Sequence, residues 1–218
     1  MRLTSSDKKR LVANIIARSS AKPHAKPVAI FAAGIPGAGK TEFLDRLFEN
    51  DKDFVRIDLD EIVKLFPGYS PAKYYQFRGQ ANIILDEVFR YCRKKGLNFV
   101  LDGTFGHKYA VENINKSLKD CSVVIFYVWK EPTASWQLTK DREVVTKRAI
   151  EKDGFIQACV NIPKNLRTVR KLYGDSVTFI ALKKESDGHN FAIIRDIHEI
   201  DELLAQTYTK DKLEKVIR

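Results

Sequence analysis

The stretch "GIPGAGKTE" (residues 34–42) has the spacing G-x-x-x-x-G-K-[ST], which few chains of this length would match by chance. Glycines let a backbone wrap closely around a phosphate, and the helix that follows adds its positive end. In this pattern the lysine reaches the β- and γ-phosphates, and the threonine hydroxyl holds Mg²⁺. A Gly-rich turn without a ligand is disfavoured, because a strand-like run precedes the loop and a helical pattern follows it. The predicted ATP or GTP loop comprises Gly34, Ile35, Pro36, Gly37, Ala38, Gly39, Lys40 and Thr41, with Thr41 as the metal ligand.

Transfer of a phosphoryl group to a hydroxyl needs a carboxylate that accepts the hydroxyl proton. The segment "RIDLDEI" places Asp58 and Asp60 at the end of a short apolar strand, on the sheet edge where ligands bind in open α/β sheets. Asp60 is the better candidate base because it lies just beyond the strand. The alternative is that Asp60 is the N-cap of the helix that begins in "EIVKLF".

Two further polar positions are candidates for binding the acceptor. In "NFVLDGTF", Asp102 and Thr104 follow another strand and could bind the magnesium shell or a polar acceptor; the alternative is a turn aspartate bonded to its own backbone. Asp86, in "ILDEVF", is spaced from Ile83 and Phe89 so that it should share the apolar face of a long helix. A carboxylate there is costly unless it faces a polar cleft, and the alternative is a boundary position half in water.

The segment "DREVVTKRAIEKDGF" contains Arg142 and Arg148, in a helix that precedes Gly154. Arginine suits phosphate because of its planar fork of donors, so this region resembles a lid that closes over phosphates. The two arginines are too far apart in sequence to share one helical face, which predicts that only one of them points into the site. The alternative for each is a solvated helix face.

The elements that must position these residues alternate between apolar runs and helical patterns. Apolar runs separated by helices indicate a parallel sheet covered on both faces. We expect an α/β fold with a mostly parallel five-stranded sheet, in which residues 191–195, after a turn at 186–190, are a candidate edge strand. The strands are expected at residues 28–34, 54–58, 98–103, 122–129 and 177–182. The helices are expected at residues 11–16, 40–49, 61–66, 71–96, 107–120, 132–154 with a break near Gly154, and 162–174, with further helices at the end of the chain.

A length of 218 residues suits one core with room for a lid. We expect a single domain, 1–218, with an N-terminal helix and linker (1–26), a core (27–184), and a C-terminal hairpin with helices (185–218). The longest apolar stretch near the N-terminus is far shorter than the roughly 20 residues that span a bilayer, and the start has no signal-peptide pattern. Cys92, Cys121 and Cys159 are too widely spaced for a disulfide framework or a zinc site, so a cytoplasmic location is expected.

The net charge of +10 favours anionic partners, from nucleotides to nucleic acid to an acidic protein, although a solvated basic surface is equally compatible with it. The aromatic and basic residues of "PAKYYQFRGQ" could form a stacking platform beside a nucleic acid.

From roughly Pro27 to Leu166 the chain resembles the zeta toxin family of P-loop kinases, which is related to the chloramphenicol phosphotransferases. The resemblance rests on the loop, on "RIDLDEI" followed by "FPGY", on "GLNFVLDGT", and on the "RE" and "IPKNL" helices. It implies an ATP-dependent kinase with a P-loop kinase fold and an arginine-bearing lid. The acceptor that it implies is the 3′-hydroxyl of a UDP-N-acetyl amino sugar, with Mg²⁺ as cofactor and an antitoxin protein as a possible partner.

The resemblance also assigns roles to single residues. The lysine of the family falls on Lys40, its base on Asp60 and its first lid arginine on Arg142. Its substrate-binding residues fall on Asp86, Asp102 and Thr104. Arg148 completes the predicted catalytic set, although it precedes the position at which the family has its second lid arginine. The chain also departs from the family at both substrate-side carboxylates, where aspartate stands for glutamate, and at Leu59, which replaces an asparagine.

Two other functions stay open at this point. One is a kinase of a nucleoside or of a nucleic-acid end, which the positive charge favours. The other is a nucleotide-dependent binding module or switch that acts through a protein partner. A pure switch has no need of Asp60 together with the lid arginines, so this set favours the kinase.

Overall fold

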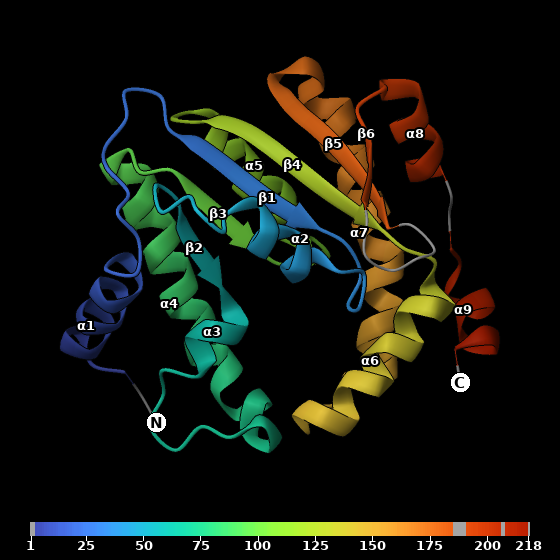
Figure 1. Ribbon diagram of the computed structural model, residues 1–218, viewed down its shortest axis with the longest axis horizontal. Helices are drawn as coiled ribbons and strands as arrows, with labels where there is room; N and C mark the ends of the chain where they lie inside the picture. The colour runs from blue at the N-terminus through green and yellow to red at the C-terminus, as the bar shows by residue number, and fades with distance from the viewer. Residues whose placement is uncertain (1–2, 185–190, 206–207, 218) are drawn as a thin grey trace.

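The computed structural model describes residues 3–184, 191–205 and 208–217, and its centre is a six-stranded sheet in the order β2-β3-β1-β4-β5-β6 (Figure 1). The pairs from β2 to β5 are parallel, and β6 pairs with β5 antiparallel. The strands are β1 (Val28–Ala33), β2 (Val55–Asp58), β3 (Phe99–Asp102), β4 (Ser122–Trp129), β5 (Val177–Lys184) and β6 (Phe191–Ile194).

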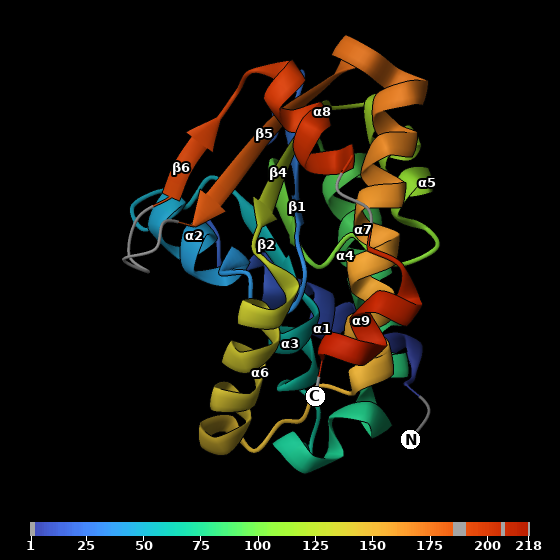
Figure 2. The same cartoon turned by 90° about the vertical axis from the view of Figure 1, so that its right-hand side faces the viewer.

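Helices cover the two faces of the sheet unequally (Figures 1 and 2). The larger apolar core joins one face to α4, α5 and α7, whereas a smaller one joins the other face to α2. No described helix is both long and apolar enough to pass through a bilayer. The helices are α1 (Ser5–Ile16), α2 (Lys40–Leu47), α3 (Leu59–Val63), α4 (Tyr74–Lys95), α5 (Ala110–Leu118), α6 (Pro132–Thr146), α7 (Lys152–Tyr173), α8 (Ile197–Ala205) and α9 (Lys210–Val216).

Several predicted boundaries were wrong. The sheet has six strands instead of five, because residues 191–194 extend it as the antiparallel edge strand. The predicted turn at 186–190 lies outside the described residues. The break in the helix expected at 132–154 falls at residues 147–151, and Gly154 lies in the first turn of α7, where backbone N–H groups have no helical partner in any case. The helix α7 then continues through the buried Pro163.

Parallel pairing brings the ends of three strands to one edge of the sheet. Asp58 of β2 is in register with Asp102 of β3, and β3 in turn pairs with β1, which leads into the loop at Gly34. The carboxyl ends of these strands therefore place the loop and both aspartates together, as expected for an open α/β sheet.

The loop that follows β3 is held by α7. Asn165 Nδ2 donates to the carbonyl oxygens of Phe105 (2.9 Å) and His107 (3.2 Å), and Asn161 Nδ2 donates to that of Gly106 (3.1 Å). Phe105 has φ +66°, a backbone conformation that residues other than glycine rarely adopt. These bonds hold the loop that carries Thr104 in its place.

We expect Asn165→Ala to lower the free energy of unfolding by roughly 1–3 kcal/mol, because two carbonyl oxygens lose their donor. Denaturant unfolding of Asn115→Ala, at an exposed asparagine of α5, is the matched control and should be close to wild type. Equal stability of the two variants would show that the asparagine bonds do not hold the loop.

Candidate active site

The predicted phosphate-binding loop (residues 34–41) connects β1 to α2 and requires glycine at two positions. A Cβ on Gly34 (φ +151°) would lie 2.5 Å from the carbonyl oxygen of Val128, and one on Gly37 (φ +82°) would lie 2.4 Å from that of Ser135. Contacts this short do not occur with real side chains, so the loop packs against the end of β4 and the start of α6 only because these residues have no side chain.

Lys40 begins α2 and turns back over the loop. Its Nζ donates to the carbonyl oxygens of Gly34 (2.8 Å) and Ile35 (2.9 Å). Burial lowers the pKa of Lys40 to about 8, and the charges of Asp102 and Asp60 oppose that shift. The lysine is thus held where the motif predicts contact with phosphate. Two carboxylates lie near enough to favour its charged form.

The helix α6 binds the predicted phosphate-binding loop through a serine near its start. The buried Ser135 donates through Oγ to the carbonyl oxygen of Pro36 (2.8 Å). This residue was missed in the sequence, because nothing in the motif points to a serine so far along the chain. Thr41, the predicted metal ligand, lies in the first turn of α2 and is exposed.

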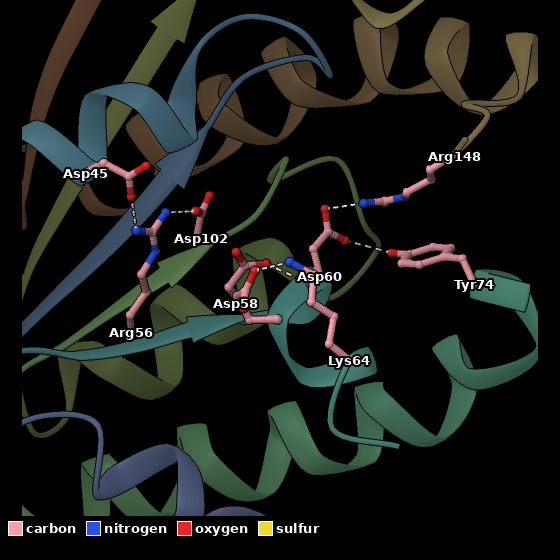
Figure 3. Close-up of polar contacts among 9 residues, drawn as sticks. Asp45, Arg56, Asp58, Asp60, Lys64, Tyr74, Asp102 and Arg148 are labelled. Atoms are coloured by element: carbon pink, nitrogen blue, oxygen red, sulfur yellow. Dashed lines mark hydrogen bonds and ion pairs between the residues drawn. The ribbon is translucent and has the colours of Figure 1, made fainter. Parts of the chain in front are cut away.

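Asp58 and Asp102 form the floor of the site (Figure 3). Asp58 Oδ1 accepts from the backbone N–H of Asp60 at 2.7 Å, so the N-cap of α3 is Asp58 and the alternative reading of Asp60 as that cap was wrong. Burial, together with the neighbouring charges of Asp102 and Asp60, raises the pKa of Asp58 to about 7. Asp58 is therefore partly protonated at neutral pH.

Asp102 is fixed by an arginine that the sequence did not single out. Arg56 Nη2 donates to Asp102 Oδ2 at 2.7 Å, and the same guanidinium forms an ion pair with Asp45 of α2. The Asp102 side chain is only 5% exposed. The alternative of a turn aspartate bonded to its own backbone receives no support from the hydrogen bonds among the described residues, in which Asp102 pairs with Arg56.

Asp60 lies above this floor and joins three elements (Figure 3). Its Oδ2 forms an ion pair with Arg148 of the α6–α7 linker, and its Oδ1 accepts a 3.0 Å hydrogen bond from the Tyr74 hydroxyl of α4. The guanidinium of Arg148 also lies over the Tyr74 ring, 3.8 Å from its centroid. Asp60 keeps 46% of its side chain exposed, so its carboxylate remains open to a ligand.

The two candidate lid arginines are placed differently. Arg148 contacts Asp60 directly, whereas Arg142 is exposed on α6, within electrostatic range of Lys40. Arg148 is thus in contact with the candidate base, whereas Arg142 acts on the site through its charge, which lowers the pKa of Lys40. The sequence predicted that only one of the two would point inward.

The remaining predicted residues lie further out. The Thr104 carbonyl oxygen accepts a hydrogen bond from the Gly34 N–H (3.2 Å), and Thr104 Oγ1 accepts one from the Gly106 N–H (3.3 Å). Thr104 therefore connects the loop after β3 to the predicted phosphate-binding loop. Asp86 is exposed instead of lying on the apolar face of α4. Partial burial raises its pKa against the opposing charges of Lys116 and His107, and none of its contacts in the described chain joins it to the Asp60 group.

This arrangement has the parts that phosphoryl transfer requires. A glycine loop and a lysine can hold phosphates, an accessible carboxylate can accept a proton, and two arginines can offset developing negative charge. The loop and the carboxylate lie at the carboxyl ends of the parallel strands, and the arginines come from α6 and the linker that follows it.

Comparisons with known proteins identify the family. The zeta toxin model matches residues 13–191, and no curated protein matches the sequence. Among solved structures, one from the PezAT chromosomal toxin–antitoxin system of Streptococcus pneumoniae has a TM-score of 0.64 and 18% identity, over 100% of this chain and 89% of that one. A structure of the AvrRxo1-ORF1:-ORF2 complex has a TM-score of 0.65 and 11% identity, over 96% and 82%. The same complex with ATP has a TM-score of 0.57 and 12% identity, over 97% and 80%.

At these identities the solved structures establish the fold, whereas the family match extends over the phosphate loop, both strand-end aspartates and the lid arginines. The chain therefore belongs to the zeta toxin family and is an ATP-dependent kinase with the P-loop kinase fold.

Proposed function

We propose that this kinase transfers the γ-phosphoryl group of ATP to a hydroxyl of a UDP-N-acetyl amino sugar, with Asp60 as the base. The observation that carries the proposal is the position of the Asp60 carboxylate. It is half-exposed, it lies within electrostatic range of Lys40, and it is paired with the lid residue Arg148. The choice of acceptor rests on the family resemblance.

In the proposed reaction the acceptor hydroxyl gives its proton to Asp60 while its oxygen attacks the γ-phosphorus. The bond between the γ-phosphorus and the bridging oxygen breaks, and its electron pair leaves with ADP. Lys40 exchanges its bonds to loop carbonyls for bonds to the phosphates, and Arg142 and Arg148 offset the charge on the transferred group.

Mg²⁺, when bound, would neutralise phosphate charge, and the exposed hydroxyl of Thr41 is the group of this chain best placed to hold it. Asp102 would then contribute its charge to the site while Arg56 keeps it in place. Thr104 and Asp86 would contribute to acceptor binding on the side of α4 and the loop after β3.

An antitoxin protein is the proposed partner, since two of the solved structures with a similar fold come from a toxin–antitoxin system and from a two-protein complex. The positive net charge of the chain suits an acidic surface on such a partner.

We expect Lys40→Ala to lower the rate of phosphoryl transfer on the order of a thousandfold, because the ammonium group that the loop places on the β- and γ-phosphates is lost. The measurement is transfer of labelled phosphate from ATP to UDP-N-acetylglucosamine. Lys94→Ala, at an exposed lysine of α4, is the matched control and should retain the wild-type rate. A Lys40→Ala enzyme with normal turnover would refute the proposed role of the loop.

We expect Asp60→Asn to lower the transfer rate by roughly a hundredfold to ten-thousandfold while ATP binding and thermal stability change little. Asp60 does not cap α3, and a half-exposed ion pair contributes only about 0–1 kcal/mol to stability. Asp58→Asn should lose less activity, because asparagine still caps the helix. An inactive Asp58→Asn beside a fully active Asp60→Asn would reverse the assignment of the base.

The raised pKa of Asp58 gives a second readout from the same variants. Because the pKa is higher in the folded state than in the unfolded chain, the wild type loses stability as the pH rises from about 4 to about 7. Asp58→Asn removes that loss. Its free energy of unfolding should exceed that of the wild type at pH 8, and the difference should shrink as the pH falls towards 4. A difference independent of pH would mean that Asp58 is not a desolvated charge.

The salt dependence of acceptor binding separates the small-molecule acceptor from a nucleic acid. Affinity for a nucleic acid falls steeply with salt, in proportion to the number of phosphates contacted. A UDP-sugar has only two phosphates, so we expect a shallow slope in titrations between low and moderate salt. A steep slope with an RNA or DNA end, together with phosphorylation of that end, would favour the alternative kinase.

A further inference from the structure

We infer that Tyr74 is a positioning residue for the transfer reaction: it orients the Asp60 carboxylate through its hydroxyl and supports the lid arginine Arg148 on its ring. This inference rests on the proposed role of Asp60 as the base. It adds a residue from α4 to a site that the motifs place on the strand ends and the lid.

The first step of the argument is that the two oxygens of Asp60 have different partners. Oδ1 accepts from the Tyr74 hydroxyl at 3.0 Å, and Oδ2 pairs with Arg148 (Figure 3). A carboxylate rotates about a soft bond, and one fixed oxygen determines the direction of the other. Tyr74 therefore keeps Oδ2 directed towards the lid side, where Arg148 approaches.

The second step concerns the protonation of Tyr74. The residue is only 5% exposed. Burial raises its pKa well above the usual value for tyrosine, and the charge of Asp60 adds to this shift. The hydroxyl therefore keeps its proton at neutral pH and remains a hydrogen-bond donor to the base.

The third step concerns Arg148. Its guanidinium lies 3.8 Å from the centre of the Tyr74 ring, so it has a partner besides Asp60. During transfer the base must be free to accept a proton, and the lid arginine is needed at the phosphoryl group. The ring allows Arg148 to release Oδ2 while one face of its guanidinium remains supported.

The linker that carries Arg148 depends on this anchor. Residues 147–151 connect α6 to α7 without helical structure, and Lys147 has φ +57°. Val144 and Val145, at the end of α6, are 70% and 81% exposed. The linker contacts the rest of the described chain through Arg148, which touches Asp60 and Tyr74, and through Ile150, which packs on the core.

Two variants separate the two roles of Tyr74. Tyr74→Phe removes the hydroxyl and keeps the ring, so kcat for transfer to UDP-N-acetylglucosamine should fall roughly ten- to a hundredfold with the KM for ATP unchanged. Tyr74→Leu removes both, so kcat should fall further. That additional loss should disappear when Arg148 is already alanine, because the ring then has no guanidinium to support. Tyr91→Phe, at an exposed tyrosine of the same helix, is the matched control and should have the wild-type kcat.

Limited trypsin digestion tests the anchor without an acceptor, because trypsin cleaves after Lys147 and Arg148. Tyr74→Leu should be cut at these positions several-fold faster than the wild type, relative to cuts elsewhere in the same sample. Tyr74→Phe and Tyr91→Leu should be cut at the wild-type rate. Mass spectrometry identifies the cut, and a thermal melt of each variant separates local release of the linker from general unfolding.

The outcomes distinguish this inference from the proposed function. If Asp60→Asn is inactive and Tyr74→Phe has the wild-type kcat, the orienting role is refuted and the base assignment stands. If Asp60→Asn is fully active, the base assignment fails, and the digestion alone then decides whether Tyr74 anchors Arg148. Unchanged cleavage of Tyr74→Leu after Lys147 and Arg148 would refute the anchor.

Discussion

The structure depends on the balance of buried charges at the carboxyl edge of the sheet. Burial alone would favour neutral forms of both Lys40 and Asp58, and it moves their pKa values towards each other, to about 8 and about 7. A buried ammonium group is very costly by itself, so Lys40 depends on the nearby charges of Asp102 and Asp60, which raise its pKa. The same two charges have the opposite effect on Asp58, whose ionised form they disfavour. The parallel register that sets Asp58 beside Asp102, one strand away from the loop, supplies that proximity.

The surrounding contacts complete this balance. Arg56 pairs with both Asp45 and Asp102, so it ties the helix after the loop to the end of β3. On the lid side, Ser135 holds the loop through Pro36. Among the described residues, the half-exposed carboxylate of Asp60 is bound by groups from α4 and the linker. The buried Asp102 is thus fixed from the sheet itself, whereas the accessible Asp60 is held by elements outside the sheet.

Local patterns predicted the parts of the site that one segment encodes. The loop, the strand-end aspartates, the parallel sheet and the lid helix follow from spacing and apolar runs. The partners Arg56, Tyr74 and Ser135 were missed, because each acts on a residue that is distant in sequence. The break near Gly154 was misplaced, since glycine costs little in the first turn of a helix, and the chain instead turns at the left-handed Lys147. The alternative that Asp60 caps the helix placed the cap two residues too late, because both aspartates of "RIDLDEI" have side chains suited to capping.

The family resemblance implies a glutamate at position 102, and the aspartate found there suits this charge balance. A carboxylate that reached an acceptor would need length and freedom, whereas Asp102 is short, is 5% exposed and is held by Arg56 at 2.7 Å. Asp102 can oppose the desolvation of Lys40 without moving, because its charge raises the pKa of that lysine. Asp102 and Asp58 are paired in register, so their charges repel each other. The positive charge of Arg56 offsets part of this repulsion. Asp60, by contrast, keeps 46% of its side chain exposed while it contacts both the linker and α4, so it remains accessible to a ligand.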